Sequence, residues 1–126
     1  MNIKLYQINL HRDKNRVAFE SLERMRTYSG EDWPDGSIYD LVFEGELPGP
    51  LEPEDLFRAL NNDSVIHAIV RQSLSVSDIL EYPEEIRVGN KLGRFWYCDP
   101  VGFKPVMFDA GQTRKAASAA TETARK

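Results

Sequence analysis

The stretch RQSLSVSDILEY (residues 71–82) decides how the second half of the chain folds, because its pattern fits two different structures. Ser75 and Asp78 have the spacing of a helix capping box, which would start a helix after Asp78. The apolar residues around them fit two short strands joined by a polar turn equally well. Tyr82-Pro83 would stop a helix within about one turn, because proline disfavours helical geometry in the residue before it. We therefore predict a strand, a turn and a second strand.

Other β-rich segments lie on both sides of this corner. Strands are predicted in NIKLYQINL (residues 2–10), IYDLVFEGEL (residues 38–47), RFWYCD (residues 94–99) and FKPVMFD (residues 103–109). The last two are joined by a tight turn with Pro100 at its second position. Pro105 lacks a backbone donor, so we expect the last strand to lie at an edge of the sheet or to carry a bulge.

Two segments predict helices. In EPEDLFRALNN (residues 52–62), Pro53 suits the first helical position, and Glu54 and Asp55 lie at the positive end of the helix dipole. The segment ESLERMRTYSG (residues 20–30) predicts a shorter helix that stops at Gly30. The segment SVIHAIV (residues 64–70) stays ambiguous, because its apolar spacing is helical while β-branched residues dominate it.

The order of these elements predicts an α+β domain, with a single mainly antiparallel sheet of about five strands packed against two short helices. A chain of 126 residues is expected to form one domain. Beyond Asp109 the only apolar side chain is that of alanine. We therefore expect residues 1–108 to form the domain and residues 109–126 to be a disordered, flexible Ala-rich tail.

Composition favours a cytoplasmic protein. No apolar run approaches the ~20 residues that cross a bilayer, so no membrane contact is expected. The N-terminus lacks the apolar region of a signal peptide. The one cysteine, Cys98, cannot form an internal disulfide, which suits a reducing compartment.

Charge is distributed unevenly along the chain. The formal net charge is −4, yet residues 31–55 contain nine acidic residues and no basic one. Such a block disfavours a protein that binds nucleic acid through a general basic surface. A solvated face is one interpretation of it. The sharper hypothesis is a binding surface for a basic protein partner.

Several segments together resemble one family. RQSLSVSDIL (residues 71–80) and FWYCDPVGFKPV (residues 95–106) resemble the YodL-like family of small bacterial proteins and domains. LYQINLHRDKNRVAF (residues 5–19), SIYDLVFEGEL (residues 37–47) and the helix EPEDLFRALN are similar to it as well. The resemblance covers roughly residues 1–108. It implies a protein of bacterial mobile genetic elements, and it supplies no catalytic residues and no cofactor.

The candidate catalytic groups are few. His11 and His67 are the only histidines, and neither has the Cys/His spacing of a metal site. Cys98 lies on a predicted strand, where a buried cysteine behaves as a small apolar residue. A small enzyme that uses Cys98 as its nucleophile is therefore the least favoured hypothesis. The adjacent acids Glu84 and Glu85 are expected in a solvated turn. We expect no cofactor and no metal.

The preferred hypothesis is a non-catalytic protein-interaction module, which acts through the acidic segment 31–55 and exposed aromatic residues. If Phe95 and Tyr97 point into the core, Trp96 is left outside, where tryptophan can anchor an interface. The expected partner-binding residues are Asp35, Asp40, Glu44, Glu46, Trp33 and Trp96. The partner is expected to be a basic protein of the host or of the mobile element, with no direct nucleic-acid contact. The alternative is an acidic inhibitor of a nucleic-acid enzyme, such as a restriction or CRISPR nuclease, that imitates DNA phosphates.

Overall fold

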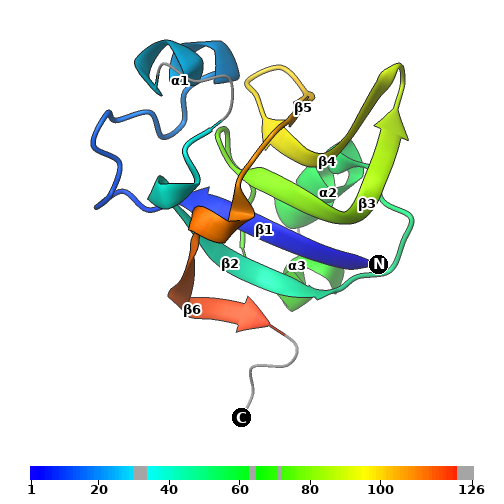
Figure 1. Ribbon diagram of the computed structural model, residues 1–126. Coiled ribbons are helices and arrows are strands. Elements are labelled where there is room, and N and C mark those ends of the chain that lie inside the picture. Colours follow the sequence, from blue (N-terminus) through cyan, green and yellow to red (C-terminus); the bar gives the residue numbers. More distant parts are fainter. Residues whose placement is uncertain (30–33, 63–64, 71, 122–126) are drawn as a thin grey trace.

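One six-stranded sheet organises the computed structural model, which describes residues 1–29, 34–62, 65–70 and 72–121. The strands lie in the order β5–β4–β3–β1–β2–β6 (Figure 1). Their bounds are Asn2–Ile8 (β1), Tyr39–Glu46 (β2), Ile79–Val88 (β3), Lys91–Cys98 (β4), Phe103–Val106 (β5) and Arg114–Thr121 (β6). Neighbouring strands pair antiparallel, except that β2 and β6 pair parallel. The predicted α+β fold with a mainly antiparallel sheet is confirmed.

The corner at residues 75–78 is a turn, and no helix follows it. The Asp78 amide donates to the Ser75 carbonyl oxygen at 3.0 Å, and the Ser75 amide donates to Asp78 Oδ2 at 2.8 Å. Ser77 has a positive φ of 83°, which a serine adopts only where its surroundings hold it. Its amide donates to the Cys98 carbonyl oxygen at 2.8 Å. The turn is thereby tied to the end of β4, and β3 starts directly after it.

Residues 72–75, where we expected a strand before this turn, do not form one. The Asn61 side chain takes the two backbone groups of Leu74 that a neighbouring strand would use, because Leu74 donates to Asn61 Oδ1 at 2.9 Å and accepts from Asn61 Nδ2 at 3.0 Å. β3 in turn continues through Pro83 to Val88. The β3–β4 register shifts between Glu81 and Ile86, so the missing Pro83 donor falls in a bulge rather than in regular pairing.

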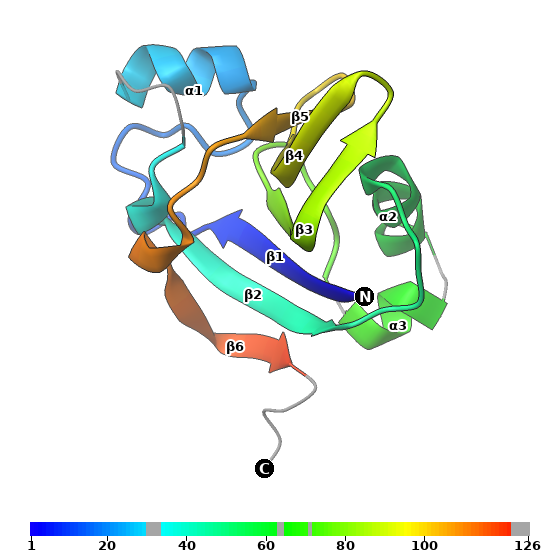
Figure 2. The same ribbon diagram turned by 45° about the vertical axis from the view of Figure 1, so that its right-hand side comes forward.

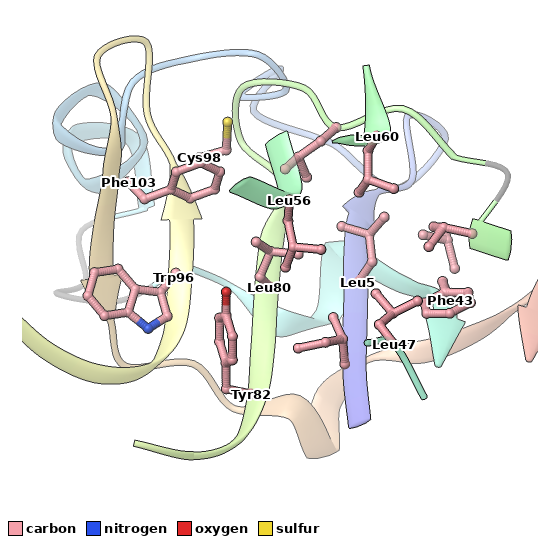
Figure 3. Packing of buried hydrophobic residues seen from close by; sticks show 14 residues of the cluster. Leu5, Phe43, Leu47, Leu56, Leu60, Leu80, Tyr82, Trp96, Cys98 and Phe103 are labelled. Atoms are coloured by element: carbon pink, nitrogen blue, oxygen red, sulfur yellow. The ribbon is translucent and has the colours of Figure 1, made fainter. Parts of the chain in front are cut away.

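Helices lie on both faces of the sheet (Figure 2). The predicted helices are observed as α1 (Leu22–Ser29) and α2 (Pro53–Leu60), and the ambiguous segment forms a short α3 (Val65–Val70). Leu56 and Leu60 of α2 pack on β1 and β3 (Figure 3). On the opposite face, Leu22 and Met25 of α1 join a second apolar cluster. Apolar burial on the two faces is what holds the helices in place.

The segment expected to be a tail contains further secondary structure. A 3₁₀ turn, η2 (Ala110–Gln112), leads into β6 beside β2, so the sheet has one strand more than the sequence indicated. Strand pairing uses backbone donors and acceptors, so the lack of large apolar side chains does not prevent it. Residues 122–126 lie outside the described residues. The prediction from Pro105 holds, since β5 is the other edge strand. Among the described helices, none has the length and apolar character needed to cross a membrane.

Candidate functional site

The acidic segment meets cations from other parts of the chain. Arg12 Nη2 lies 2.7 Å from Asp40 Oδ1, and Lys4 Nζ lies 3.8 Å from Glu44 Oε2. The N-terminal amine lies 2.9 Å from Glu46 Oε2. These three carboxylates all belong to β2, whose antiparallel neighbour β1 brings the amine and Lys4 opposite them. The segment has no counter-charge in its own sequence, but the tertiary structure supplies one.

The same three carboxylates differ in how far they reach solvent. The Asp40 side chain is 14% exposed, and it also accepts a hydrogen bond from Asn9 Nδ2 at 2.9 Å. The side chains of Glu44 and Glu46 are 40% and 66% exposed, and their ion pairs are correspondingly weak. Asp35 caps the 3₁₀ turn η1 (Gly36–Ile38), where its carboxylate accepts from the Ser37 amide and hydroxyl. Of these four acids, Glu44 and Glu46 are therefore the ones best placed to meet a partner.

Trp96 is not available to a partner, which corrects the expectation from the sequence. Its side chain is 1% exposed and packs under α2, and its Nε1 donates to the Gly93 carbonyl oxygen at 3.0 Å. Alternation along β4 does put Trp96 opposite Phe95 and Tyr97, but both faces of the sheet are covered here. The other tryptophan, Trp33, lies outside the described residues.

A closed ring of contacts that the sequence did not predict lies on the α1 face of the sheet. The Tyr6 hydroxyl donates to Glu81 Oε1 at 2.6 Å, and Arg94 Nη2 donates to Glu81 Oε2 at 2.7 Å. Arg94 lies over the Phe95 ring, 5.7 Å from its centroid. The Phe108 ring lies 5.6 Å from Phe95 and 5.2 Å from Tyr6, measured between centroids, which closes the ring. Glu81 is 5% exposed, and its carboxylate holds the guanidinium of Arg94 in place.

Arg94, Phe95 and Phe108 of the ring line an open groove with a volume of about 720 Å³. Leu92 and Met107 also line this groove, and they are 49% and 67% exposed. Arg94 also lines a smaller pocket, together with Lys4 and Glu81. A signal for the network was present in the sequence, because Glu81 is a single acid between the apolar residues of a predicted strand.

The candidate nucleophile is poorly suited to catalysis. Cys98 is 2% exposed and lies beside Phe103 (Figure 3). Burial raises the pKa of the Cys98 thiol to about 12, and the charges of Asp78, Glu54 and Asp99 add to the effect. Thiolates, not thiols, act as nucleophiles. An unreactive thiol in the core is what these surroundings produce.

The histidines and acids do not form a metal site in the part of the chain that the structure describes. His11 is exposed in the loop after β1. His67 belongs to α3, but its side chain lies outside the described residues. No group of three or more His, Cys, Asp or Glu side chains that could hold a metal ion occurs among the described residues. Glu84 and Glu85 are exposed on β3 rather than in a turn.

Asp78 is a buried carboxyl group whose hydrogen-bond partners, Ser75 and Gln7, are both neutral. It is 3% exposed, and its Oδ2 accepts from the Ser75 amide at 2.8 Å and from Gln7 Nε2 at 3.0 Å. Burial raises the pKa of Asp78 to about 7, although both hydrogen bonds act in the opposite direction. Its hydrogen bonds join the corner to β1. These hydrogen bonds give Asp78 a structural role at the corner.

Comparison with known proteins points to a domain family. A family model described as the YodL-like domain matches residues 2–108. No curated protein and no solved structure matches the chain. The match spans β1 to β5, including the acidic strand and the groove, and it ends before η2 and β6.

Proposed function

The chain belongs to the YodL-like domain family, and we propose that it is a non-catalytic protein-interaction module of the cytoplasm. Its partner is a basic protein of the host or of the mobile element that encodes it. The proposal rests on the row of carboxylates along β2, of which Glu44 and Glu46 are 40% and 66% exposed. Exposed charges of one sign steer a partner of the opposite sign and set its orientation.

Two features support binding over catalysis. Cys98 is 2% exposed and has a raised pKa, so it lacks both access and reactivity. Asp78 and Glu81, the two most deeply buried carboxyl groups among the described residues, are engaged in hydrogen bonds that join elements of the fold. A general acid or base needs a substrate within hydrogen-bond reach, and both carboxylates are at most 5% exposed.

Imitation of DNA phosphates is the less favoured alternative. It requires carboxylates that are free to meet the cations of a nuclease. Asp40 already holds Arg12 at 2.7 Å, and Asp55 holds Arg58 at the same distance. The pairing lowers the negative potential that such an inhibitor would need.

A charge-reversal experiment tests the proposal. Glu44→Lys with Glu46→Lys should abolish cross-linked capture of the partner from a lysate of the native host. The matched control reverses the exposed pair Glu84 and Glu85 on the β3–β4 hairpin, and it should leave capture intact. Circular dichroism and a two-dimensional amide spectrum would verify that both variants fold. Equal capture by the two variants would refute a role for β2.

A further inference from the structure

The outer edge of β2 is occupied by a strand that does not belong to the family match. The matched region ends at residue 108, and within it β2 is the last strand on its side of the sheet. β6, which starts at residue 114, then covers that edge (Figures 1 and 2). An open strand edge is a ready template for another extended chain. The region matched to the family therefore ends on a strand-accepting edge, and in this chain β6 fills it.

The fit between β6 and this edge is irregular. Asp40 and Leu41 pair with Arg114 and Lys115, and Phe43 and Glu44 pair with Ala120 and Thr121. Between these two stretches, Val42 alone stands opposite the four residues 116–119 of β6. Among the described residues, β6 ends at Thr121 opposite Glu44, and no described residue of β6 pairs with Gly45 or Glu46. A chain that paired without this break would make a longer regular ladder along β2.

The chemistry of β6 indicates what kind of segment the edge accepts. It begins with Arg114 and Lys115, both exposed, and continues with alanine, serine and threonine. The two cations lie in register with the start of β2, the strand that carries Asp40, Glu44 and Glu46. Neighbouring strands lie about 4.8 Å apart, well inside the distance at which salt screens charges. Opposite charges on the two strands therefore attract each other.

We propose that the edge of β2 is a docking site for an extended basic segment of a partner protein, which adds to the sheet as a parallel strand. β6 is the replaceable internal occupant of that site. The inference rests on the proposed function and specifies how the partner would bind. Main-chain hydrogen bonds supply affinity in this mode, while side chains supply selectivity. Cations in the incoming strand then meet the carboxylates of β2, as Arg114 of β6 lies in register with Asp40.

β6 sets the apparent affinity of the β2 edge for the partner. A partner binds only the fraction of molecules in which β6 has left the edge, so its apparent dissociation constant is raised by the inverse of that fraction. Weakening β6 should therefore tighten binding without any change to the docking surface. Where β6 covers the edge in about nine-tenths of the molecules, freeing the edge lowers the apparent dissociation constant about tenfold.

Two proline variants of the full chain separate this mechanism from a general effect on the tail. Ala120→Pro removes the backbone donor and disturbs the position that pairs with Phe43. Ser118→Pro is the matched control, because residue 118 lies in the stretch without a paired position. In amide hydrogen exchange, β2 amides should exchange faster in Ala120→Pro than in the wild type. Ser118→Pro should resemble the wild type.

The probe is a synthetic peptide with the sequence of residues 113–121 whose alanines are replaced by valine, to raise its strand propensity. Measured by fluorescence anisotropy, its dissociation constant should be on the order of tenfold lower for Ala120→Pro than for the wild type or Ser118→Pro. A peptide in which glutamine replaces both cations should bind less tightly. Adding Glu44→Lys and Glu46→Lys to Ala120→Pro should weaken binding of the cationic peptide.

Each contrary result overturns the inference. Equal dissociation constants for the two proline variants would show that β6 does not compete for the edge. Faster exchange without peptide binding would show that the exposed edge does not accept a strand. The capture experiment tests the proposed function separately. If Glu44→Lys with Glu46→Lys abolishes capture of the partner from the lysate, the proposed function stands even where the peptide experiments fail. If that variant keeps the partner, the proposed function fails by its own test.

Discussion

Replacing Asp78 tests the structure at the most heavily buried carboxyl group of the described residues. The usual pKa of this group is 3.8, and burial raises it to about 7 in the folded protein. The folded state therefore holds the proton more tightly than the unfolded state. The free energy of unfolding contributed by Asp78 is highest below pH 3.8, falls as the pH rises through the interval to about 7, and is constant above it.

The magnitude follows from the same two values. The difference between 3.8 and about 7 corresponds to about 4 kcal/mol at roughly 1.4 kcal/mol for each pH unit. Asp78→Asn removes the titration but keeps an oxygen that can accept from the Ser75 amide and Gln7 Nε2. As the pH rises from about 4 to about 8, the free energy of unfolding of Asp78→Asn should therefore increase by about 4 kcal/mol relative to that of the wild type.

Urea unfolding at a series of pH values, followed by tryptophan fluorescence, measures this difference. Subtracting the variant from the wild type cancels the titration of the other groups. Asp78→Ala is the control, because it loses both the charge and the acceptor for Ser75 and Gln7. The free energy of unfolding of Asp78→Ala should follow the same pH dependence as that of Asp78→Asn, but should be about 1–3 kcal/mol lower at every pH. If the difference in free energy of unfolding between Asp78→Asn and the wild type stays constant from about pH 4 to pH 8, the reasoning is refuted.

Three further predictions concern β4. A Cβ at Gly93 would lie 2.6 Å from Pro105 Cβ, so Gly93→Ala should lower the free energy of unfolding by about 1–3 kcal/mol in urea titrations, and an unchanged midpoint would contradict this close approach. Arg94→Ala leaves the buried carboxylate of Glu81 without its ion pair and should cost about 1–3 kcal/mol, whereas Glu81→Gln with Arg94→Ala should recover part of the loss. At about pH 8, Cys98 in the folded protein should react with a thiol reagent more than about a hundredfold slower than Cys98 in the urea-unfolded protein. Rapid labelling of the folded protein would support a nucleophile at Cys98 instead.

The acidic strand illustrates what a sequence can and cannot predict about a site. The nine acids of residues 31–55 are plain in the sequence, and so is the strand that contains Asp40, Glu44 and Glu46. Their counter-charges come from Arg12, Lys4 and the N-terminus, which lie far from them along the chain. Local patterns carry no record of such pairs. The exposure of each carboxylate therefore had to come from the packed structure.

Trp96 shows a second limit. Alternation along the strand correctly separates it from Phe95 and Tyr97. A strand pattern alone does not say whether one face or both faces are covered, since that depends on helices elsewhere in the chain. With α1 on one face and α2 on the other, Trp96 is buried at 1% exposure.

By itself, the sequence determined the fold class, both predicted helices and the turn at residues 75–78, because caps, prolines and apolar periodicity act over a few neighbouring residues. The family followed from the resemblance of several segments, which the match over residues 2–108 confirms. Only the tertiary structure decided that Asn61 replaces a strand partner at Leu74, that Glu81 holds Arg94 over Phe95, and that β6 pairs with β2. Those features join residues far apart along the chain. They form when the sheet brings separate segments together, and side-chain pattern in any one segment does not encode them.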